Sequence, residues 1–247
     1  MIRTVVVGLL TSLALVFVLP WLILWSVIAG DPGLMCAGAA RYLRFANRLA
    51  GIRIHAEGLE NLPAGASVLA ANHASNADPA ALIAVLPRRV VVLVKRELFH
   101  IPIFATAMRL AGYVPVDRGS RESVASIAAA TAALKQGLSL LVFPEGARSP
   151  DGRMRSFKRG AFAAAIDAGV PIVPVSISGS QRVMPKGSRR IYPGDVTIRF
   201  GEPVDASRFT RERRSELLAS IEARVACGLP PEQQPSRPTS EGASESL

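Results

Sequence analysis

Residues 72–78 read Asn-His-Ala-Ser-Asn-Ala-Asp, and their types and spacing suit proton transfer. A histidine can accept a proton near neutral pH, so His73 is a candidate general base. Asp78, five residues later, can fold back and hold the imidazole in one tautomer, as the acidic member of a hydrolytic triad does. The sequence has no Gly-x-Ser-x-Gly element that would indicate a serine nucleophile. The pair therefore predicts activation of a substrate hydroxyl; a helix start capped by Asn72, Ser75 or Asp78 is the competing interpretation.

Residues 143–149 read Phe-Pro-Glu-Gly-Ala-Arg-Ser, which indicates a turn that can face an anion. The guanidinium of Arg148 suits a phosphate group, and main-chain N–H groups around Gly146 can point at a negative charge. Glu145 can orient Arg148 or accept a hydrogen bond from a substrate hydroxyl. Arg118 also follows a short apolar stretch, so two arginines at strand ends can converge on one phosphate. For each arginine taken alone, a solvated surface position is the competing interpretation.

A third stretch, residues 170–175, reads Val-Pro-Ile-Val-Pro-Val. Two prolines among β-branched residues predict an edge or terminal strand, because proline cannot donate to a sheet ladder. The stretch can form an apolar wall for an acyl chain, and ordinary core packing is the competing interpretation.

The net charge of the chain is +10, which favours an anionic partner such as nucleic acid, anionic lipid or a phosphorylated substrate. The chain holds only two Trp and three Tyr, so the aromatic platforms of a single-strand nucleic-acid binder are not indicated. Two cysteines far apart and three histidines predict neither a disulfide framework nor a metal site. We expect no metal and no cofactor.

The N-terminal region predicts a membrane anchor over residues 1–30. Val5–Ala29 carries no charge and as a helix is long enough to cross a bilayer core of roughly 30 Å. A cleaved signal peptide and a re-entrant hairpin bent at Pro20 are the alternatives. Residues 31–50 predict an interfacial or packing helix. Arg3 precedes the apolar run, whereas four arginines follow it, Arg41, Arg44, Arg48 and Arg53, so the positive-inside rule predicts that the body of the protein lies on the cytoplasmic face.

Residues 51–228 alternate short β-branched runs with helix-like segments, which predicts an α/β domain with a mixed, largely parallel sheet flanked by helices. Residues 229–247 are rich in Pro, Ser and Glu and predict a disordered tail. The expected strands lie near residues 52–55, 68–71, 90–94, 113–116, 139–143, 171–176 and 196–200. Helices are expected near residues 34–49, 102–110, 121–136, 159–168 and 210–228.

Four blocks, in this order, resemble those of the lysophospholipid acyltransferase family. The family's Asn-His-x4-Asp, Gly-x4-Asp-Arg-like, Phe-Pro-Glu-Gly-Thr-Arg-Ser and Val-Pro-x-x-Pro-Val blocks correspond to residues 72–78, 112–118, 143–149 and 170–175. The resemblance covers roughly residues 51–203. Ala147 stands where the commonest form of the family has Thr, and Ala74 where many members have Gln. Neither departure removes a titratable group, so both bear on the acceptor and leave the chemistry unchanged.

The resemblance implies transfer of a fatty acyl group from acyl-CoA or acyl carrier protein to the hydroxyl of 1-acyl-glycerol-3-phosphate, giving phosphatidate at a membrane. His73 would be the general base and Asp78 its orienting partner, on a glycerolipid-acyltransferase-like domain. Acceptor binding would fall to Arg118, Glu145, Gly146 and Arg148, and Pro174 would belong to the block linked to the acyl donor. A different lysolipid, glycerol 3-phosphate as acceptor, and a non-catalytic lipid-binding protein are the alternatives.

Overall fold

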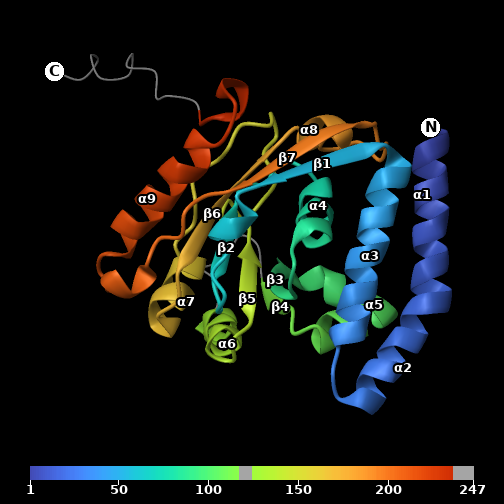
Figure 1. Ribbon diagram of the computed structural model, residues 1–247, viewed down its shortest axis with the longest axis horizontal. Helices are drawn as coiled ribbons and strands as arrows, with labels where there is room; N and C mark the ends of the chain where they lie inside the picture. Colours follow the sequence, from blue (N-terminus) through green and yellow to red (C-terminus); the bar gives the residue numbers. More distant parts are fainter. Residues whose placement is uncertain (117–123, 236–247) are drawn as a thin grey trace.

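The computed structural model describes residues 1–116 and 124–235, and its centre is a seven-stranded sheet with helices on both faces (Figure 1). The strand order is β1-β7-β6-β2-β5-β3-β4, and every neighbouring pair is parallel except β6 and β7. The predicted mixed, largely parallel sheet is thus confirmed. The strands are β1 (Ile52–Glu57), β2 (Val68–Ala71), β3 (Val90–Lys95), β4 (Val114–Val116), β5 (Ser139–Val142), β6 (Ile172–Ser178) and β7 (Gly194–Phe200).

The helices form two layers around this sheet. They are α1 (Ile2–Leu13), α2 (Leu19–Ala29), α3 (Gly33–Ala50), α4 (Ala77–Val85), α5 (Pro102–Leu110), α6 (Val124–Lys135), α7 (Gly160–Ala168), α8 (Ser180–Val183) and α9 (Arg214–Cys227). Alternation along β2 shows how the layers arise: Val68 and Ala70 pack with α6, α7 and α9, whereas Leu69 and Ala71 pack with α3 and α4. Because both faces of the central strands are covered, these strands are continuous apolar runs.

The parallel strands bring the candidate residues to one edge of the sheet. Strands β2, β3, β5 and β6 run in the same direction, so their carboxyl ends meet. The loop after β2 carries His73, and the loop after β5 carries Glu145. Ligands of open α/β sheets bind at this edge.

Strand β6 corrects one expectation. The prolines of residues 170–175 predict an edge or terminal strand. This segment leads into β6, which instead lies inside the sheet, between β2 and β7. The regular β6–β7 ladder begins at the pair Val175–Phe200, one residue beyond Pro174. Opposite the proline stands Gly201, where an added Cβ would lie 3.0 Å from Pro174 Cγ. The missing N–H of Pro174 therefore falls beside the ladder, and the absent side chain of Gly201 leaves space for the ring.

The N-terminal 28 residues after Met1 form one continuous helix, Ile2–Ala29, with a mean hydropathy of 2.5 and none of its most apolar window buried. Its length and composition suffice to cross a membrane, and its exposure excludes a buried core helix. A π-helical turn, η1 (Ala14–Val18), joins α1 to α2 just before Pro20, and the helix bends there (Figure 1). Proline and π-turns are established causes of such bends.

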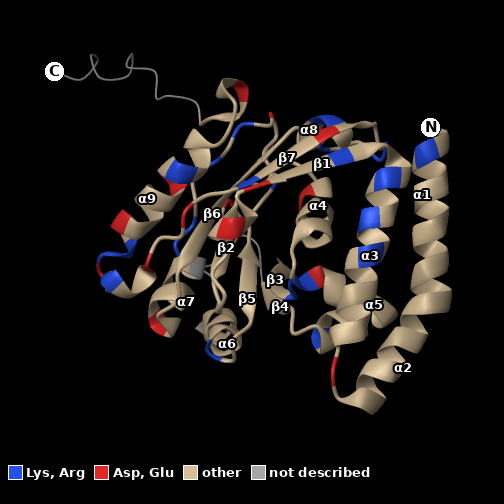
Figure 2. Ribbon diagram, viewed as in Figure 1, with Lys and Arg blue, Asp and Glu red and all other residues tan. Residues whose placement is uncertain are grey.

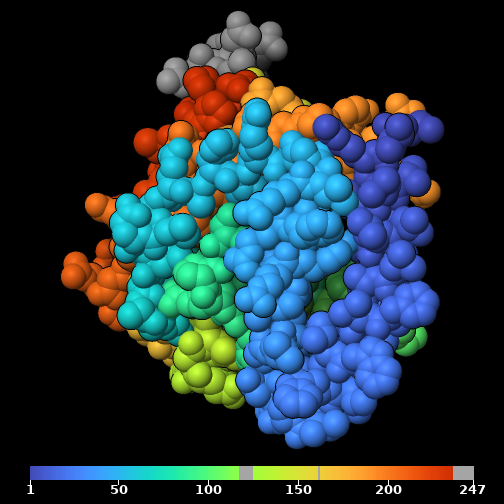
Figure 3. Space-filling view, turned by 45° about the vertical axis from the view of Figure 1, so that its right-hand side comes forward, coloured from blue at the N-terminus to red at the C-terminus, as the bar shows by residue number. Residues whose placement is uncertain are grey.

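Helix α3 runs back along this helix after a turn at Gly30, where the backbone is left-handed with φ of 64°. Thr11 Oγ1 and Tyr42 Oη, 2.6 Å apart, join the two across the hairpin. Figure 3 shows the N-terminal helix and α3 side by side on the outer surface, with a hollow between the two helices. The inner face of α3 buries Ala50 against the sheet, whereas Arg41, Arg44 and Arg48 on its outer face are exposed. Residues 33–50 thus form a packing helix with a basic outer face.

The C-terminal boundary lies later than predicted. The tail was expected from Leu229, but this residue is 4% exposed, and Gln233 is 1% exposed in the 3₁₀ turn η5 (Pro231–Gln233). The carbonyl oxygen of Gln233 accepts a hydrogen bond from the Met154 main chain at 2.8 Å. Tertiary contacts therefore hold a polar segment that composition alone assigned to the tail.

Candidate active site

His73 and Asp78 form a buried hydrogen-bonded pair at the carboxyl end of β2. The distance from His73 Nδ1 to Asp78 Oδ2 is 2.8 Å, and the side chains are 5% and 0% exposed. Asp78 lies in the first turn of α4, and its Oδ2 also accepts hydrogen bonds from the Ala74 and Ser75 main chains. Since a carboxylate oxygen holding two N–H groups acts as an acceptor, Nδ1 is the donor and Nε2 is left as the basic nitrogen.

Two further contacts fix this loop. The Asn72 side chain donates to the carbonyl oxygen of Ile177 at 2.9 Å and accepts from its N–H at 2.7 Å. Asn72 thereby pairs with β6 as another strand would. The Phe143 ring stacks on the imidazole of His73, with ring centroids 4.3 Å apart. The imidazole is therefore held between Asp78 and an aromatic ring, in a site that is largely shielded from water.

Glu145 lies beneath the loop. Its Oε1 accepts a hydrogen bond from the main-chain N–H of His73 at 2.8 Å, and the residue is 3% exposed. Burial raises the pKa of this carboxyl to about 7, against the lowering effect of the hydrogen bond from His73. Oε2 is buried with no hydrogen-bond partner in the described part of the chain. The shape of the site therefore depends on a carboxyl group that titrates near neutral pH.

Three cationic side chains surround the turn after β5. Arg148 is half-buried, and no ion pair holds its guanidinium among residues 1–116 and 124–235. Its carbonyl oxygen accepts a hydrogen bond from Lys186 Nζ at 2.9 Å. An added Cβ at Gly146 would lie 2.9 Å from Lys158 Nζ, so the ammonium group sits against the glycine. Gly146 has φ of 72°, a conformation that glycine adopts without strain.

The main-chain N–H groups around Gly146 were expected to face an anion. That of Gly146 itself donates to the carbonyl oxygen of Phe143 at 3.0 Å and closes the turn, so this N–H is not directed at an anion. Of the other predicted site residues, Arg118 lies outside the described residues. Pro174 is buried in β6, paired with Ala70 on β2.

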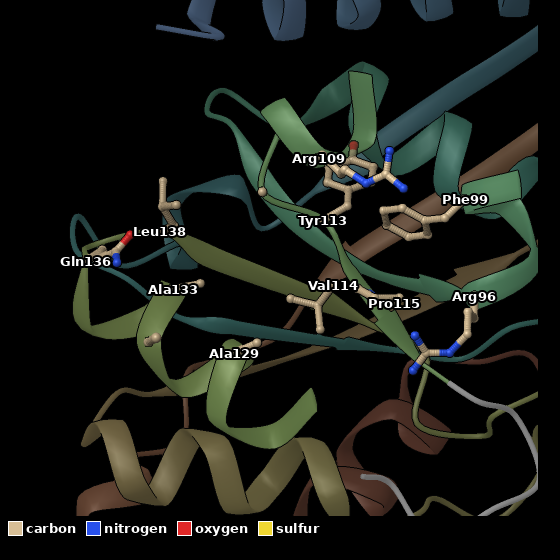
Figure 4. Close-up of a pocket in the computed structure, with 12 residues that line it drawn as sticks. Arg96, Phe99, Arg109, Tyr113, Val114, Pro115, Ala129, Ala133, Gln136 and Leu138 are labelled. Carbon is tan, nitrogen blue, oxygen red and sulfur yellow. The ribbon is translucent and has the colours of Figure 1, made fainter. Parts of the chain in front are cut away.

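A separate cavity of about 640 Å³ lies along β4 (Figure 4). Its walls include Tyr113 and Pro115 from the second sequence block and Arg109, whose guanidinium lies 5.8 Å from the centre of the Phe99 ring. Burial raises the pKa of Tyr113 to about 12. None of the described site residues lines this cavity, so residues 112–115 of the second block contribute to a different surface from the His73 pair.

Sequence reasoning missed three contributors to the site: Lys158, Lys186 and Phe143. The two lysines belong to the basic stretch of the sequence, but no local spacing ties either of them to Gly146 or Arg148. The sequence pattern indicates Phe143 only as the end of a strand and gives no sign that its ring stacks on His73. Among the described residues, no group of three or more His, Cys, Asp or Glu side chains could hold a metal ion.

Comparison with known proteins identifies families and chains to which this one is similar. Residues 53–178, about half of the chain, match the family model described as Acyltransferase. The chain is 37% identical over 177 residues to the chloroplastic 1-acyl-sn-glycerol-3-phosphate acyltransferase LPAT1 of Arabidopsis thaliana, covering 69% of this chain and 49% of that protein. With the human alpha enzyme of the same name the identity is 39%, covering 66% and 58%. The chain thus spans about half the length of the first curated relatives.

A solved structure extends the likeness to the whole fold. The 1-acyl-sn-glycerophosphate acyltransferase PlsC from Thermotoga maritima superimposes with a TM-score of 0.81 at 29% identity, over 92% of this chain and 93% of that one. The match of sequence blocks, family model and fold confirms the predicted resemblance. The chain belongs to the acyltransferase family.

Proposed function

We propose that this protein transfers a fatty acyl group from an acyl thioester to the free hydroxyl of 1-acyl-glycerol-3-phosphate, giving phosphatidate. The observation that carries the proposal is the buried pair of His73 and Asp78, which leaves one imidazole nitrogen as a base. The names of the relatives support this acceptor.

The proposed step needs no acyl-enzyme. The acceptor hydroxyl gives its proton to His73 Nε2 while its oxygen bonds to the thioester carbonyl carbon. The tetrahedral intermediate then collapses, the carbon–sulfur bond breaks, and the protonated imidazole returns the proton to the thiolate. In support, the hydroxyls of Ser75 and Ser149 are already engaged, donating to the Met184 carbonyl and to Asp151. The free cysteines, Cys36 and Cys227, lie on α3 and α9 and not on the loops that carry His73 and Glu145.

The acceptor phosphate would bind to the cationic side chains beside the catalytic pair. Arg148 offers a planar fork for phosphate, and Lys158 and Lys186 add two point charges. We include Arg118 in this group, as the family resemblance implies. Glu145 would act through the shape of the loop, because its Oε1 is bonded to the His73 main chain. Pro174 would contribute through strand β6, which would form an apolar wall for the acyl chain of the donor.

Acyl-CoA or acyl carrier protein would supply the thioester, with no other cofactor and no nucleic-acid partner. The apolar helix Ile2–Ala29 would hold the protein at a membrane, where the lipid acceptor and product reside. The arginines of α3 would place the catalytic domain on the cytoplasmic face. This division gives a membrane anchor at residues 1–30, the packing helix that follows, and an acyltransferase domain that extends through the buried Gln233.

Thiol release tests the proposal. Detergent-solubilised protein would receive 1-acyl-glycerol-3-phosphate and a long-chain acyl-CoA, with acyl carrier protein thioester, glycerol 3-phosphate and other lysolipids in parallel. We expect acceptor-dependent release that falls by roughly 10²–10⁴-fold in His73→Ala. His55→Ala is the matched control. His55 is exposed on the edge strand β1, and its ring is hydrogen-bonded to Asp195 on β7.

Full activity of His73→Ala would contradict the general-base role. Thiol release with only glycerol 3-phosphate or only another lysolipid would identify a different acceptor, while the proposed acyl transfer would stand. The absence of release with every donor and acceptor, in protein shown to be folded, would favour a non-catalytic lipid-binding protein.

A further inference from the structure

A pocket of about 560 Å³ lies where α1, the end of α3 and β1 meet. Three arginines from three elements line it: Arg3 from α1, Arg48 from α3 and Arg53 from β1. Its remaining walls are Gly51, Ile52, Ile54 and Pro193. Segments at opposite ends of the domain sequence thus form one basic hollow.

The three arginines differ in their partners. Arg53 is held by Asp195 through two hydrogen bonds of 2.8 and 2.7 Å, so its charge is balanced. Arg3 and Arg48 are exposed and have no hydrogen-bond or ion-pair partner among the residues the structure describes. The pocket therefore keeps two uncompensated guanidinium groups, which suit an anion with several acceptor oxygens.

The floor of the pocket depends on Gly51. This residue ends α3 with φ of 76°, and its carbonyl oxygen accepts a hydrogen bond from Gly194 at 3.1 Å. An added Cβ would lie 2.8 Å from Arg3 Nη1 and 2.9 Å from Pro193 Cβ. A glycine here lets the guanidinium of Arg3 lie against the backbone.

The pocket is separate from the candidate active site. It opens beside β1, the edge strand, whereas His73 follows β2. Strands β7 and β6 stand between them in the sheet. An anion in the pocket would therefore be a second one, distinct from the phosphate of the acceptor.

The surroundings point to a lipid surface as the source of the anion. Figure 2 shows basic residues at the start of α1 and along the second half of α3, while the rest of α1 and all of α2 carry no charge. The exposed side chains of that uncharged part are large and apolar, among them Leu9, Phe17, Trp21 and Trp25. The pocket thus lies where the apolar helix surface gives way to charge, the order in which a bilayer presents hydrocarbon and headgroups.

We propose that the pocket of Arg3, Arg48 and Arg53 binds the phosphate group of an anionic phospholipid headgroup. The bound lipid would fix the position of the domain on the membrane. Free inorganic phosphate offers the same chemistry, so the test separates the two sources.

Thermal unfolding in neutral detergent micelles tests the proposal, because a ligand that binds the folded state raises Tm. The full chain would be measured with phosphatidylglycerol, phosphatidylcholine or inorganic phosphate added. We expect phosphatidylglycerol alone to raise Tm. The double variant R3K/R48K keeps the charge but loses the planar forks, so its affinity for phosphatidylglycerol should fall on the order of tenfold.

Two variants serve as matched controls. R41K/R44K makes the same exchange on exposed arginines of α3 outside the pocket and should behave as the wild type. R148Q alters the candidate active site and should also keep the rise in Tm. If R3K/R48K is too unstable to measure, Pro193→Glu places a carboxylate in the pocket and should abolish the rise.

Three results would overturn the proposal. Equal effects of R3K/R48K and R41K/R44K would show a diffuse charge effect. An equal rise in Tm with inorganic phosphate would assign the pocket to a soluble anion. No difference between phosphatidylglycerol and phosphatidylcholine would show that the pocket recognises no anionic headgroup.

Discussion

The carboxyl group of Glu145 accepts a hydrogen bond from the main-chain N–H of His73, with an Oε1 to N distance of 2.8 Å. The two residues are 72 positions apart and reach each other because β5 and β2 are parallel neighbours. The other oxygen, Oε2, is buried without a hydrogen-bond partner in the described residues. Glu145 therefore supports the loop that carries the candidate base, whereas the family resemblance had grouped it with acceptor binding.

Glu145→Gln should change how stability depends on pH. Burial raises the Glu145 pKa from 4.5 to about 7. A raised pKa makes the stability contribution full below about pH 4.5 and lost as pH rises through about 7, because the unfolded chain ionises first. At about 1.4 kcal/mol per pKa unit, wild type should lose about 3 kcal/mol relative to Glu145→Gln across this window. Urea unfolding below pH 4.5 and above pH 7 measures this difference in the free energy of unfolding. Free energies of unfolding that change in parallel with pH in the two proteins would contradict the prediction.

Asp78→Asn should lower kcat while the fold survives. Asp78 Oδ2 accepts three N–H groups, including His73 Nδ1 at 2.8 Å. An amide cannot hold the imidazole in the same tautomer while serving all of these donors. We expect a loss in kcat on the order of 10²–10⁴-fold. Asp151→Asn is the control, because that exposed carboxylate accepts hydrogen bonds only from Ser149 and Arg153 within its own turn. Unchanged kcat in Asp78→Asn would exclude an orienting role.

Asn72→Ala should destabilise the protein strongly. The side chain serves both the N–H and the carbonyl oxygen of Ile177, and its loss leaves two buried main-chain groups unpaired. At about 1–3 kcal/mol for each group, the free energy of unfolding should fall by about 2–6 kcal/mol. Asn61→Ala removes only one bond, to the Phe200 carbonyl in a less buried place, and should cost less. Urea unfolding compares the two; equal losses would mean that water replaces Asn72.

Arg148→Gln should weaken acceptor binding more than catalysis. Arg148 precedes Ser149, whose main-chain N–H donates to the His73 carbonyl oxygen at 2.9 Å, and charge-assisted bonds of its guanidinium to a phosphate would be worth about 1.5–3 kcal/mol. We therefore expect KM for 1-acyl-glycerol-3-phosphate to rise by roughly 10- to 100-fold, with a smaller change in kcat. Arg182→Gln, an exposed arginine on α8, is the control for net charge. Steady-state kinetics against acceptor concentration decides; equal KM values for the two variants would remove Arg148 from phosphate binding.

The sequence by itself determined the local features of this protein. Apolar runs and turn residues placed the strands and most helices, and the expected range 102–110 coincides with α5. The pairing of His73 with Asp78 was also readable, because five residues that run from a strand into a helix bring the two side chains together. Contacts of this kind depend on the backbone of a single turn.

Only the tertiary structure decided the contacts between distant segments. The bond of Glu145 to His73, that of Asn72 to Ile177 and the place of β6 inside the sheet all depend on strand order. Strand order follows from burying both faces of the sheet at once, which is a property of the whole chain and of no single window. The basic pocket of Arg3 and Arg48 arises in the same way, since it exists only where the N-terminal helix meets α3 and β1.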